Sequence, residues 1–598
     1  MISLDQMSLI LSKSEHSRDD IYSSSLHYIL LQMPNSGFSF ITEQFLLLLS
    51  NKDIGKLDIS LSDEDMRRAF YSRLGSYYSF NDIKYKGELE FLAKRNIALT
   101  RCVIDFRCSA YTRVPIEGNK YYNIIHRLQL SDKYIHAGVE INPILSQLIA
   151  QSPCLSEIAI ARSKDICIDI DETTLLALGT HRRPHMKKVD LNTYPLFSDT
   201  ISSFCLACPN LIAFKVRIRG RGTVTVHNAC AQAVITYCPN LEVLELESWE
   251  ISDSFLPSIL TLTSLRELSL IQSDKLTSTG IQSLLRSLKD IEKLSLAGHQ
   301  LDADSVSVLQ CIGSSCPKLK FLYIWTTACE NIPPVPTISL LYPLLERVDL
   351  NMDTSLADPI MLALALLCPA LRTLHLHNGG TDVGMRAVLQ GCPLLENLGL
   401  LEMDTYASSD VPLVEAACPC LSKLRLRSPS VSDYQLCGLF HHTPNLATLS
   451  LHLGPLATDT TIACLSQHCR RLTAFTLKLT SFGRCTIRIT LASLTALTSL
   501  ELLNVSVLSM PAVTSADLVA LAAGCPRLRD VCLTKCTYDV TVADILLFIS
   551  KCTHLQSLTV LGGDGSDRDD VVVNRDNILN QCVKDMYPLL RFEFNKFT

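Results

Sequence analysis

The sequence predicts an α/β solenoid, a curved horseshoe of short units in which parallel strands line the concave face and helices cover the convex face. Two observations carry this prediction. A unit of strand, polar bend and helix recurs about every 24 to 31 residues, and cysteines recur in phase with it. A stack also suits a chain of 598 residues that are 47% apolar, because each unit buries its apolar face only against its neighbours. One globular core rarely grows to this size.

The segment from Cys368 to Gly391 illustrates the unit. Leu374 and Leu376 alternate with polar residues, which is the period of a strand with one buried face. After a polar bend at 378–380, apolar residues recur at helical spacing over 383–389, and Gly391 ends the helix. Cys392 then opens the next unit. Each unit therefore contributes one short strand and one helix.

Units of this kind are predicted along almost the whole chain, each starting three residues before the first apolar position of its strand. The starts are Asn51, Asn96, Tyr122, Ser152, Arg183, Cys208, Cys238, Leu262, Leu288, Cys316, Tyr342, Cys368, Cys392, Cys418, Thr443, Cys469, Leu494, Cys525, Cys552 and Tyr587. The gap after Asn51 is long, and a hidden strand is expected there at Tyr77 to Phe80.

The L-x-x-L-x-L strands and the repeated Cys-Pro-x-Leu openings resemble the cysteine-containing leucine-rich repeats over about nine-tenths of the chain. The chain resembles F-box/leucine-rich-repeat proteins or the elongin-cullin-box families such as the ZYG and PRAME proteins. In the cysteine-containing subfamily a Cys or Asn usually follows the strand by three residues and bonds to neighbouring backbone. Only Cys536 fills that position here, so an irregular inner ladder is expected.

Nine cysteines share one position of the unit, which indicates one shared structural role. They are Cys208, Cys238, Cys316, Cys368, Cys392, Cys418, Cys469, Cys525 and Cys552. A small apolar side chain is needed there to pack against the next unit, and a free thiol meets this need. Cys205 and Cys208 form a C-x-x-C pair, but no second pair lies at zinc-finger spacing. We therefore expect core thiols.

The chain divides into four segments by regularity of the repeat. Residues 1–50 are a helical N-terminal cap or an adaptor-binding segment, 51–150 are irregular repeats, 151–561 are regular repeats, and 562–598 hold an acidic loop and a C-terminal capping repeat. The first segment is open to three interpretations, because a solenoid must cover its first apolar face whatever else the segment does.

Capping alone is the simplest interpretation of residues 1–50. An F-box is the second, although the usual Leu-Pro opening and the Cys-x-x-Trp-like end are absent. The third is the elongin-binding helix of the ZYG and PRAME families. Its motif consists of a small residue, then a Leu, then a Cys four residues after the Leu. Ser25, Leu26 and Leu30 match it with Leu in place of Cys, and Phe45 lies in the expected following helix. Leu26, Leu30 and Phe45 are thus candidate adaptor-binding residues.

Composition and the absence of certain motifs exclude several classes of function. The net charge of −6 and the pI near 6.2 give no overall attraction to nucleic acid. The longest apolar runs, at 45–49 and 360–368, are far shorter than a membrane-spanning helix, and the N-terminus does not resemble a secretion signal. A cytoplasmic or nuclear location is expected. Phosphate-loop, H-E-x-x-H and G-x-S-x-G motifs are absent, so we expect a non-enzymatic protein without cofactor or metal.

Outward strand residues are predicted to form the concave binding surface. Its centre is Phe321, Tyr323 and Trp325, which one strand places outward together. The full set of predicted partner-binding residues is Phe321, Tyr323, Trp325, Arg347, His375, His377, Lys423, Arg425, Arg427, Lys215 and Arg217. His375 and His377 are close enough to share a metal, but no third ligand is apparent, so solvated histidines are expected.

The pattern favours a protein that binds other proteins. The first hypothesis is a substrate-recognition subunit of a cullin-type ubiquitin ligase, in which residues 1–50 bind an elongin-like or Skp-like adaptor and cullin, and the concave face holds the target. The alternative is a static scaffold in a cytoskeletal, ciliary or DNA-repair assembly, with residues 1–50 acting only as a cap. Exposure of Leu26, Leu30 and Phe45 would distinguish the two.

Overall fold

The computed structural model describes most of the repeat array. The described residues are 79–80, 101–105, 127–131, 141–150, 152–160, 170–193, 198–218, 224–247, 249–272, 275–298, 305–325, 342–351, 354–401, 418–454, 456–479, 489–507, 513–536, 538–539, 541–562 and 591–595. The adaptor-binding candidates Leu26, Leu30 and Phe45 lie outside these residues. The same holds for the whole segment 1–50 and for the acidic loop after Gly562.

Two compact units divide the chain. The first comprises Met1–Ile251 with Thr261–Leu265, and the second comprises Ser252–Leu260 with Arg266–Thr598. The strands of the first unit are β1 (Ser79–Phe80), β2 (Arg101–Asp105), β3 (Arg127–Ser131), β4 (Glu157–Ile160), β5 (Lys188–Thr193), β6 (Ala213–Ile218) and β7 (Val243–Glu247). Its described helices are α7 (Ile141–Ala150), α8 (Glu172–Gly179), α9 (Ser198–Ala207) and α10 (Val224–Tyr237).

The second unit continues the same alternation. Its strands are β8 (Glu267–Ile271), β9 (Lys293–Ala297), β10 (Phe321–Trp325), β11 (Arg347–Asn351), β12 (Thr373–Leu376), β13 (Asn397–Leu400), β14 (Lys423–Ser428), β15 (Thr448–Leu453), β16 (Ala474–Leu479), β17 (Leu502–Val507), β19 (Asp530–Cys536), β21 (Ser557–Gly562) and β22 (Arg591–Asn595). Its helices are α11 (Leu256–Ile259), α12 (Ser278–Leu285), α13 (Ser305–Ser315), α14 (Thr354–Leu367), α15 (Asp382–Gly391), α16 (Asp433–His442), α17 (Asp459–His468), α18 (Ser515–Gly524) and α19 (Val542–Lys551), with 3-10 turns at Asp253–Phe255 and Leu491–Ala496.

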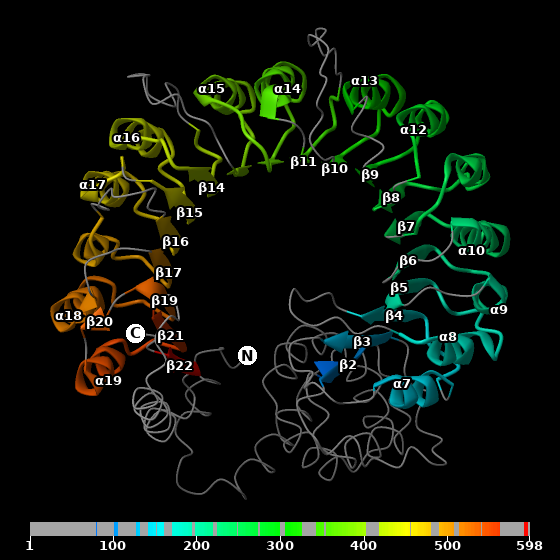
Figure 1. The fold of residues 1–598 in the computed structure, drawn as a ribbon, viewed down its shortest axis with the longest axis horizontal. Coiled ribbons are helices and arrows are strands. Elements are labelled where there is room, and N and C mark those ends of the chain that lie inside the picture. Colours follow the sequence, from blue (N-terminus) through cyan, green and yellow to red (C-terminus); the bar gives the residue numbers. More distant parts are fainter. Residues whose placement is uncertain are drawn as a thin grey trace, which may run out of the picture. The chain divides into compact units, whose positions relative to one another are not determined.

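Every strand pairs in parallel with the strand of the next repeat, in chain order within each unit. In the second unit, for example, Phe321 of β10 pairs with Lys293 of β9 on one side and Arg347 of β11 on the other. The short strands β18 (Val513–Thr514) and β20 (Tyr538–Asp539) form a separate parallel pair. Within each unit the strands line the inner side of an arc and the helices its outer side (Figure 1). This confirms the predicted leucine-rich-repeat solenoid.

The predicted repeat starts from Asn96 onward place the described strands correctly with two shifts, and the strand predicted after Asn51 lies outside the described residues. The hidden strand expected at Tyr77 to Phe80 is present as β1. The unit predicted to start at Leu494 starts at Leu497 instead, because its strand begins at Leu502. Leucines at 491, 494, 497 and 500 recur every third residue, so the sequence fits two registers and the 3-10 helix Leu491–Ala496 occupies the first. The last strand begins at Arg591, one residue earlier than Tyr587 predicts.

Successive side chains of each strand alternate between the core and the surface. In β14, Leu424 and Leu426 are buried, whereas Lys423, Arg425 and Arg427 are exposed. A strand sends successive side chains to opposite faces, so one set packs under the helices and the other covers the inner face. Removing a leucine of this kind from water stabilises the fold by about 1.5–3 kcal/mol.

The phased cysteines are free, buried thiols, as the sequence predicts. Several of their sulfur atoms donate weak hydrogen bonds to backbone carbonyls of the preceding repeat: Cys316 Sγ lies 3.6 Å from the Leu288 oxygen, and Cys525 Sγ lies 3.3 Å from the Leu497 oxygen. Burial raises the pKa of both thiols to about 12, so they stay protonated and can donate. These weak bonds connect one repeat to the next, and they add to backbone bonds: the Leu497 carbonyl, for example, also accepts from the Leu500 N–H at 3.2 Å.

Three units that begin with another residue also place a buried hydrogen-bond donor at this position. Arg183 is 1% exposed and donates to the carbonyls of Ile149 and Ser152 at 2.7 and 2.8 Å, and to the carbonyl of Leu178 at 3.0 Å. Tyr342 donates its hydroxyl to the Leu309 carbonyl at 2.8 Å. Thr443 donates to the Leu439 carbonyl at 3.0 Å. A donor is not required at this position, because Leu262 and Leu288 begin their units with buried apolar side chains.

A second ladder joins the helix N-termini of neighbouring repeats. Asp358 accepts hydrogen bonds from the backbone N–H and the hydroxyl of Thr381, at 2.7 and 2.6 Å. The same arrangement recurs at Asp253–Thr277, Asp433–Thr458 and Asp459–Thr490. Each threonine is an N-cap or precedes a helical turn, so one carboxylate fixes the entry of the next helix. None of the described helices is long and apolar enough to cross a membrane.

Candidate functional site

The site begins with the aromatic side chains of β10. Phe321, Tyr323 and Trp325 all point to the inner face, because Leu322 and Ile324 between them are buried. The Tyr323 and Trp325 rings stack with centroids 6.5 Å apart. Trp325 is 39% exposed, so a large apolar surface faces solvent on the strand layer. The sequence predicts this placement from strand alternation alone.

Side chains from the neighbouring repeats contact these rings. The Arg347 guanidinium lies over the Phe321 ring, 5.2 Å from its centroid, and adds a cation–π contact. The His377 ring lies 5.0 Å from the Trp325 ring, two strands away across β11. We call Tyr323, Trp325 and His377 the aromatic cluster. Its rings are held by contacts rather than left to rotate freely, which reduces the entropy lost when a partner binds.

Asp349 of β11 connects His375 of β12 with His377, the residue that directly follows this strand. Its Oδ1 lies 3.0 Å from Nε2 of His377, and its Oδ2 lies 3.4 Å from Nδ1 of His375. Only 14% of the Asp349 side chain is exposed, against about 30% for each imidazole. Because the carboxylate orients His377 and His377 contacts Trp325, Asp349 positions the aromatic cluster. The sequence predicts that His375 and His377 are solvated, but both rings are half-buried and each lies within hydrogen-bonding distance of Asp349.

The ionisation of Asp349 follows from these contacts. Burial by itself raises the pKa of the carboxyl group, but the hydrogen bonds from His375 and His377 lower it more, so the pKa lies well below its usual value of 3.8. Asp349 is therefore ionised at neutral pH. A buried negative charge with two imidazole donors is a stable arrangement, and the carboxylate can hold both rings in place across the physiological range.

Gly399 leaves a low area beside the histidines. It occupies the outward position of β13 that pairs with His375, and a Cβ there would lie 2.7 Å from Cδ2 of the His375 ring. The ring can lie against β13 only because the glycine has no side chain. The surface between the aromatic cluster and β14 is thus shallow, with raised aromatic groups on one side and cations on the other.

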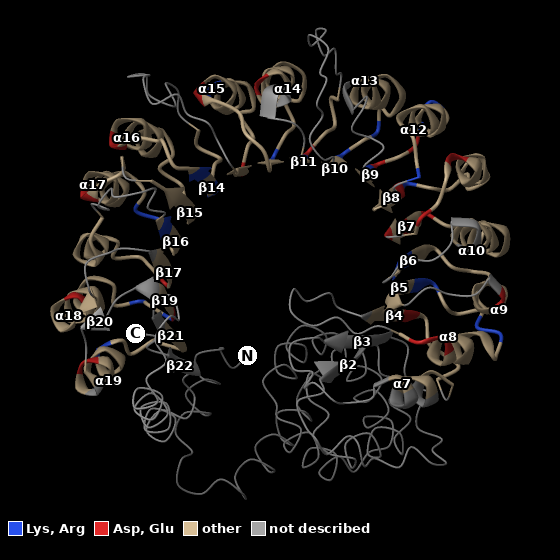
Figure 2. Ribbon diagram, in the orientation of Figure 1, with Lys and Arg blue, Asp and Glu red and all other residues tan. Residues whose placement is uncertain are grey.

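Lys423, Arg425 and Arg427 extend from β14 as predicted, and all three are exposed. No ion pair between Lys423 or Arg425 and a carboxylate is present among the described residues. Arg427 is in register with His452 of β15, which in turn is in register with Lys478 of β16. Basic residues thus gather on the strands that follow the aromatic cluster within the second unit (Figure 2).

Lys215 and Arg217 of β6 have a different environment. Arg217 lies 2.6 Å from Asp190, 2.8 Å from Glu245 and 3.3 Å from Glu247, all on the adjacent strands β5 and β7. Burial alone lowers the pKa of Arg217, but these three carboxylates raise it above its usual value. Lys215 lies 3.7 Å from Glu245. The two residues are placed on the inner face as predicted, but they face carboxylates rather than forming a basic spot.

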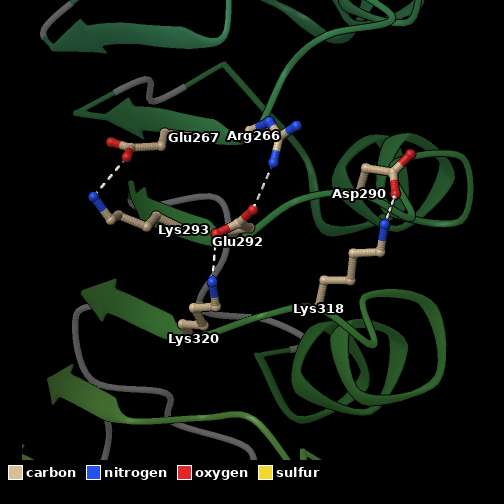
Figure 3. A network of polar contacts seen from close by, with 7 residues as sticks. All are labelled: Arg266, Glu267, Asp290, Glu292, Lys293, Lys318 and Lys320. Carbon is tan, nitrogen blue, oxygen red and sulfur yellow. Dashed lines mark hydrogen bonds and ion pairs between the residues drawn. The ribbon is translucent and has the colours of Figure 1, made fainter.

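Ion pairs also balance the charge on β8 and β9, as Figure 3 shows. Lys293 of β9 bonds Glu267 of β8 at 2.5 Å. Just before these strands, Glu292 pairs with Arg266 at 3.0 Å and Lys320 at 2.7 Å. Exposed pairs of this kind add little stability, but each cation has its carboxylate.

The set of partner-binding residues predicted from the sequence does not include Asp349, Gly399, His452 or Lys478. The signal was present, because each occupies an outward strand position. Their roles depend on which residues of neighbouring strands stand opposite, and that requires the register. No group of three or more potential metal ligands occurs in the part of the chain that the structure describes.

The recurring unit, the parallel pairing of its strands and the separation of strands and helices into an inner and an outer layer identify the class of protein. The chain is a leucine-rich-repeat protein of the cysteine-containing type. More narrowly, it is similar to F-box/LRR-repeat proteins. It is 30% identical over 190 residues to a putative F-box protein of Arabidopsis thaliana, covering 31% of this chain and 55% of that protein. It is 29% identical over 152 residues to putative F-box/LRR-repeat protein 9 of Arabidopsis thaliana, covering 25% of this chain and 51% of that protein.

The chain spans about half the length of these curated relatives. F-box/LRR-repeat protein 4 of Bos taurus is 30% identical over 129 residues, or 21% of this chain and 20% of that protein. No protein-family model matches the chain.

Among solved structures, the chain is similar to the TLR13–ssRNA13 complex at a TM-score of 0.40 and 16% identity, covering 80% of this chain and 65% of that chain. It is similar to the yeast Rad7–Elc1 complex at a TM-score of 0.37 and 13% identity, covering 76% of this chain and 96% of that chain. Similarities with TM-scores and identities this low carry no argument about function.

Proposed function

We propose that the chain is the substrate-recognition subunit of a cullin-type ubiquitin ligase and that it holds its target protein on the inner face around Trp325. The observation that carries the proposal is the aromatic cluster held by Asp349. An exposed, immobilised tryptophan beside two other rings is the kind of group that dominates protein-protein binding energies. The chain would act by binding, and its own residues would catalyse no step.

The geometry suits a protein target better than a small molecule. The inner face is an open surface of parallel strands, and the aromatic cluster stands on it between the charge-balanced strands β8 and β9 and the cationic strand β14. Small ligands are usually held in concave pockets that enclose most of their surface. A peptide or domain with an apolar anchor and acidic groups matches the rings and the cations together.

The ligase connection rests on the similarity to F-box/LRR-repeat proteins, since an F-box binds the adaptor of a cullin complex. In this chain the adaptor would bind residues 1–50 through Leu26, Leu30 and Phe45. These residues lie outside the described part, so their role stays a prediction from the sequence. A static scaffold would use the same inner face but no adaptor.

An affinity purification from native cytosol tests the proposal. Intact protein is compared with Leu26→Asp/Leu30→Asp and with Trp325→Ala, and co-purified proteins are identified by mass spectrometry. Two exposed residues on the outer helices supply matched controls: Leu366→Asp in α14, 81% exposed, and Tyr434→Ala in α16, 59% exposed. Each control makes the same chemical change away from the proposed surfaces.

We expect an adaptor and a cullin with the intact protein and both controls, and their loss with the Leu26/Leu30 variant. A separate set of proteins should be lost with Trp325→Ala, by a factor of roughly 30 if the anchor contributes about 2 kcal/mol. Absence of any ligase component from the intact protein, with targets retained by the folded Leu26/Leu30 variant, would leave the scaffold as the function.

A further inference from the structure

Two half-buried cysteines meet where the helices α16 and α17 of neighbouring repeats pack side by side (Figure 1). Cys437 belongs to α16 and Cys464 to α17, both in the second unit. The Cys464 sulfur lies 3.7 Å from the carbonyl oxygen of Cys437. The Cys437 sulfur lies 4.0 Å from the carbonyl oxygen of Thr460. Each thiol therefore reaches the main chain of the opposite helix.

These two contacts bring the sulfur atoms close to each other. In an α-helix the carbonyl of one residue accepts from the N–H four residues later, so the Thr460 carbonyl belongs to the turn that ends at Cys464. Each sulfur thus lies at the piece of main chain that carries the other cysteine. The two side chains also interact directly, because the Cys437 thiol is hydrogen-bonded to the side chain of Cys464. A disulfide needs two side chains that point toward each other from nearby main-chain positions, and this pair has that arrangement.

Solvent access separates this pair from a second pair of facing thiols in the first unit. There the Cys238 sulfur lies 3.9 Å from the carbonyl oxygen of Cys205. Both of these cysteines are 0% exposed, so a reagent in solution cannot reach them in the folded protein. Cys437 and Cys464 combine the contact with partial exposure.

The two thiols differ in their readiness to react. Burial raises the pKa of the Cys437 thiol to about 12, and the Cys464 side chain and the charge of Asp433 contribute to this rise. Cys437 therefore keeps its proton at neutral pH and is a poor first nucleophile, because the thiolate is the reactive form. The first attack on a reagent falls to Cys464. Cys437 is suited to the second step, since the fold already holds it beside the sulfur that it must attack.

We propose that Cys437 and Cys464 form a redox modification site, which a small-molecule disulfide converts into a reversible covalent link between α16 and α17. In the first step the Cys464 thiolate attacks the small disulfide, forms a mixed disulfide and releases one small thiol. In the second step the Cys437 sulfur gives its proton to solvent, attacks the Cys464 sulfur and releases the second small thiol. Two protein thiols are oxidised to one disulfide, and one small disulfide is reduced to two thiols.

The link would join two repeats that contribute to the inner face. α16 follows β14, which carries Lys423 and Arg425, and α17 follows β15, which carries His452. A covalent bond between the two helices opposes local opening of these repeats. The oxidation state of the pair thus controls how readily this part of the solenoid opens. The inference goes beyond the proposed function and does not depend on it.

The test uses the full chain, reduced and then equilibrated with glutathione buffers of increasing oxidised fraction. Remaining thiols are blocked with N-ethylmaleimide under denaturing conditions, and the protein is digested with trypsin without reduction. One tryptic peptide, 428–470, contains Cys437, Cys464 and Cys469. The disulfide leaves this peptide two hydrogens lighter and with one alkyl group in place of three. A second digest with chymotrypsin identifies which two cysteines are joined.

We expect a bond between Cys437 and Cys464, with Cys469 alkylated. Its equilibrium constant with glutathione should be roughly 100-fold larger in the native protein than in denaturant, because the fold holds the thiols together. Cys437→Ser should stop at a glutathione adduct of Cys464, and Cys464→Ser should react more slowly than Cys437→Ser. Cys420→Ser is the matched control, since it replaces an exposed cysteine elsewhere and should leave the bond unchanged.

Three alkylated cysteines in peptide 428–470 at every glutathione ratio would overturn the proposal. A bond that includes Cys469, or an equilibrium constant no larger than that of the denatured chain, would overturn it as well. So would a glutathione adduct of Cys464 that persists in the wild type, because Cys437 would then be out of reach. Thermal melts verify that the serine variants fold. Adaptor and target binding are measured on the reduced protein, so the proposed function and this inference can fail separately.

Discussion

His377 Nε2 lies 3.0 Å from Oδ1 of Asp349, one strand away on the inner face, and the same imidazole ring lies 5.0 Å from the Trp325 ring. A buried carboxylate thus determines where an exposed tryptophan and its neighbours stand. Binding surfaces work best when their large side chains are already in the bound position, because less side-chain freedom is lost on association. The pair Asp349–His377 is therefore the part of the site that a mutation can test without touching the tryptophan.

Asp349→Asn should destabilise the second unit by about 1.5–3 kcal/mol at neutral pH, because two hydrogen bonds lose their charged acceptor. The pKa of Asp349 in the fold lies below 3.8, so its contribution is fully present above that pH and is lost as the pH falls below it. The difference between the urea unfolding curves of wild type and variant should stay constant from pH 6 to about 4 and should shrink as the pH is lowered below that. A difference that stays constant down to pH 3 would contradict the assignment.

Arg183→Met should be among the most damaging single changes in the first unit. Its guanidinium donates hydrogen bonds to the carbonyls of Ile149, Ser152 and Leu178. The methionine would remove all three bonds from the buried site, although the Ile149 and Ser152 carbonyls each still accept from a backbone N–H. We expect a loss of about 3 kcal/mol or more in the free energy of unfolding, measured by denaturant titration. The exposed neighbour Arg182→Met is the control and should change stability by less than about 0.5 kcal/mol.

His227 of α10 should make the first unit sensitive to mild acid. It is 1% exposed, packs near Trp249, and neither ring nitrogen has a hydrogen-bond partner in the part of the chain that is described. Burial lowers the pKa of His227 below 6.5, and Glu250 offsets this only in part. The unfolded chain then binds the proton more readily, so stability is present above about pH 6.5 and falls below it.

His227→Phe tests this dependence. Between pH 7.5 and 5.5 the wild type should lose up to about 1.4 kcal/mol per pH unit once below 6.5, and the variant should show a correspondingly flatter profile. The comparison is made by chemical denaturation at each pH. An exposed histidine, His185, replaced by Phe provides the control and should leave the profile of the wild type unchanged.

Thiol reactivity should separate the cysteines by their position. Cys208, Cys368 and Cys469 are buried, and burial raises the pKa of each thiol to about 12, so neither access nor thiolate is available. Cys420 is exposed. Brief alkylation of the native protein followed by peptide mapping should modify Cys420 first and the buried set only after denaturant is added. Early modification of the buried set would mean that the repeats open readily.

The repeat architecture could be predicted from the sequence because each unit repeats the same local pattern. Alternating leucines place the strands, and the phase of the cysteines marks where each unit begins. The single large register error, at Leu494, arose where leucines recur every third residue and two registers satisfy the same pattern. The outward placement of Trp325 and of the β14 cations needed only the period of two, so it too was predicted.

What the tertiary structure alone decided is which of those outward residues act together. Arg217 and Arg427 are equivalent in sequence pattern, yet three carboxylates from adjacent strands surround Arg217, whereas His452 and Lys478 stand beside Arg427. Neighbours on the inner face come from repeats some 25 residues apart, so no local pattern relates them. The sequence by itself determined the strands, their buried faces and the thiol positions, because these follow from short-range periodicity. The pairing of charges and rings across strands depends on register, which only the assembled stack defines.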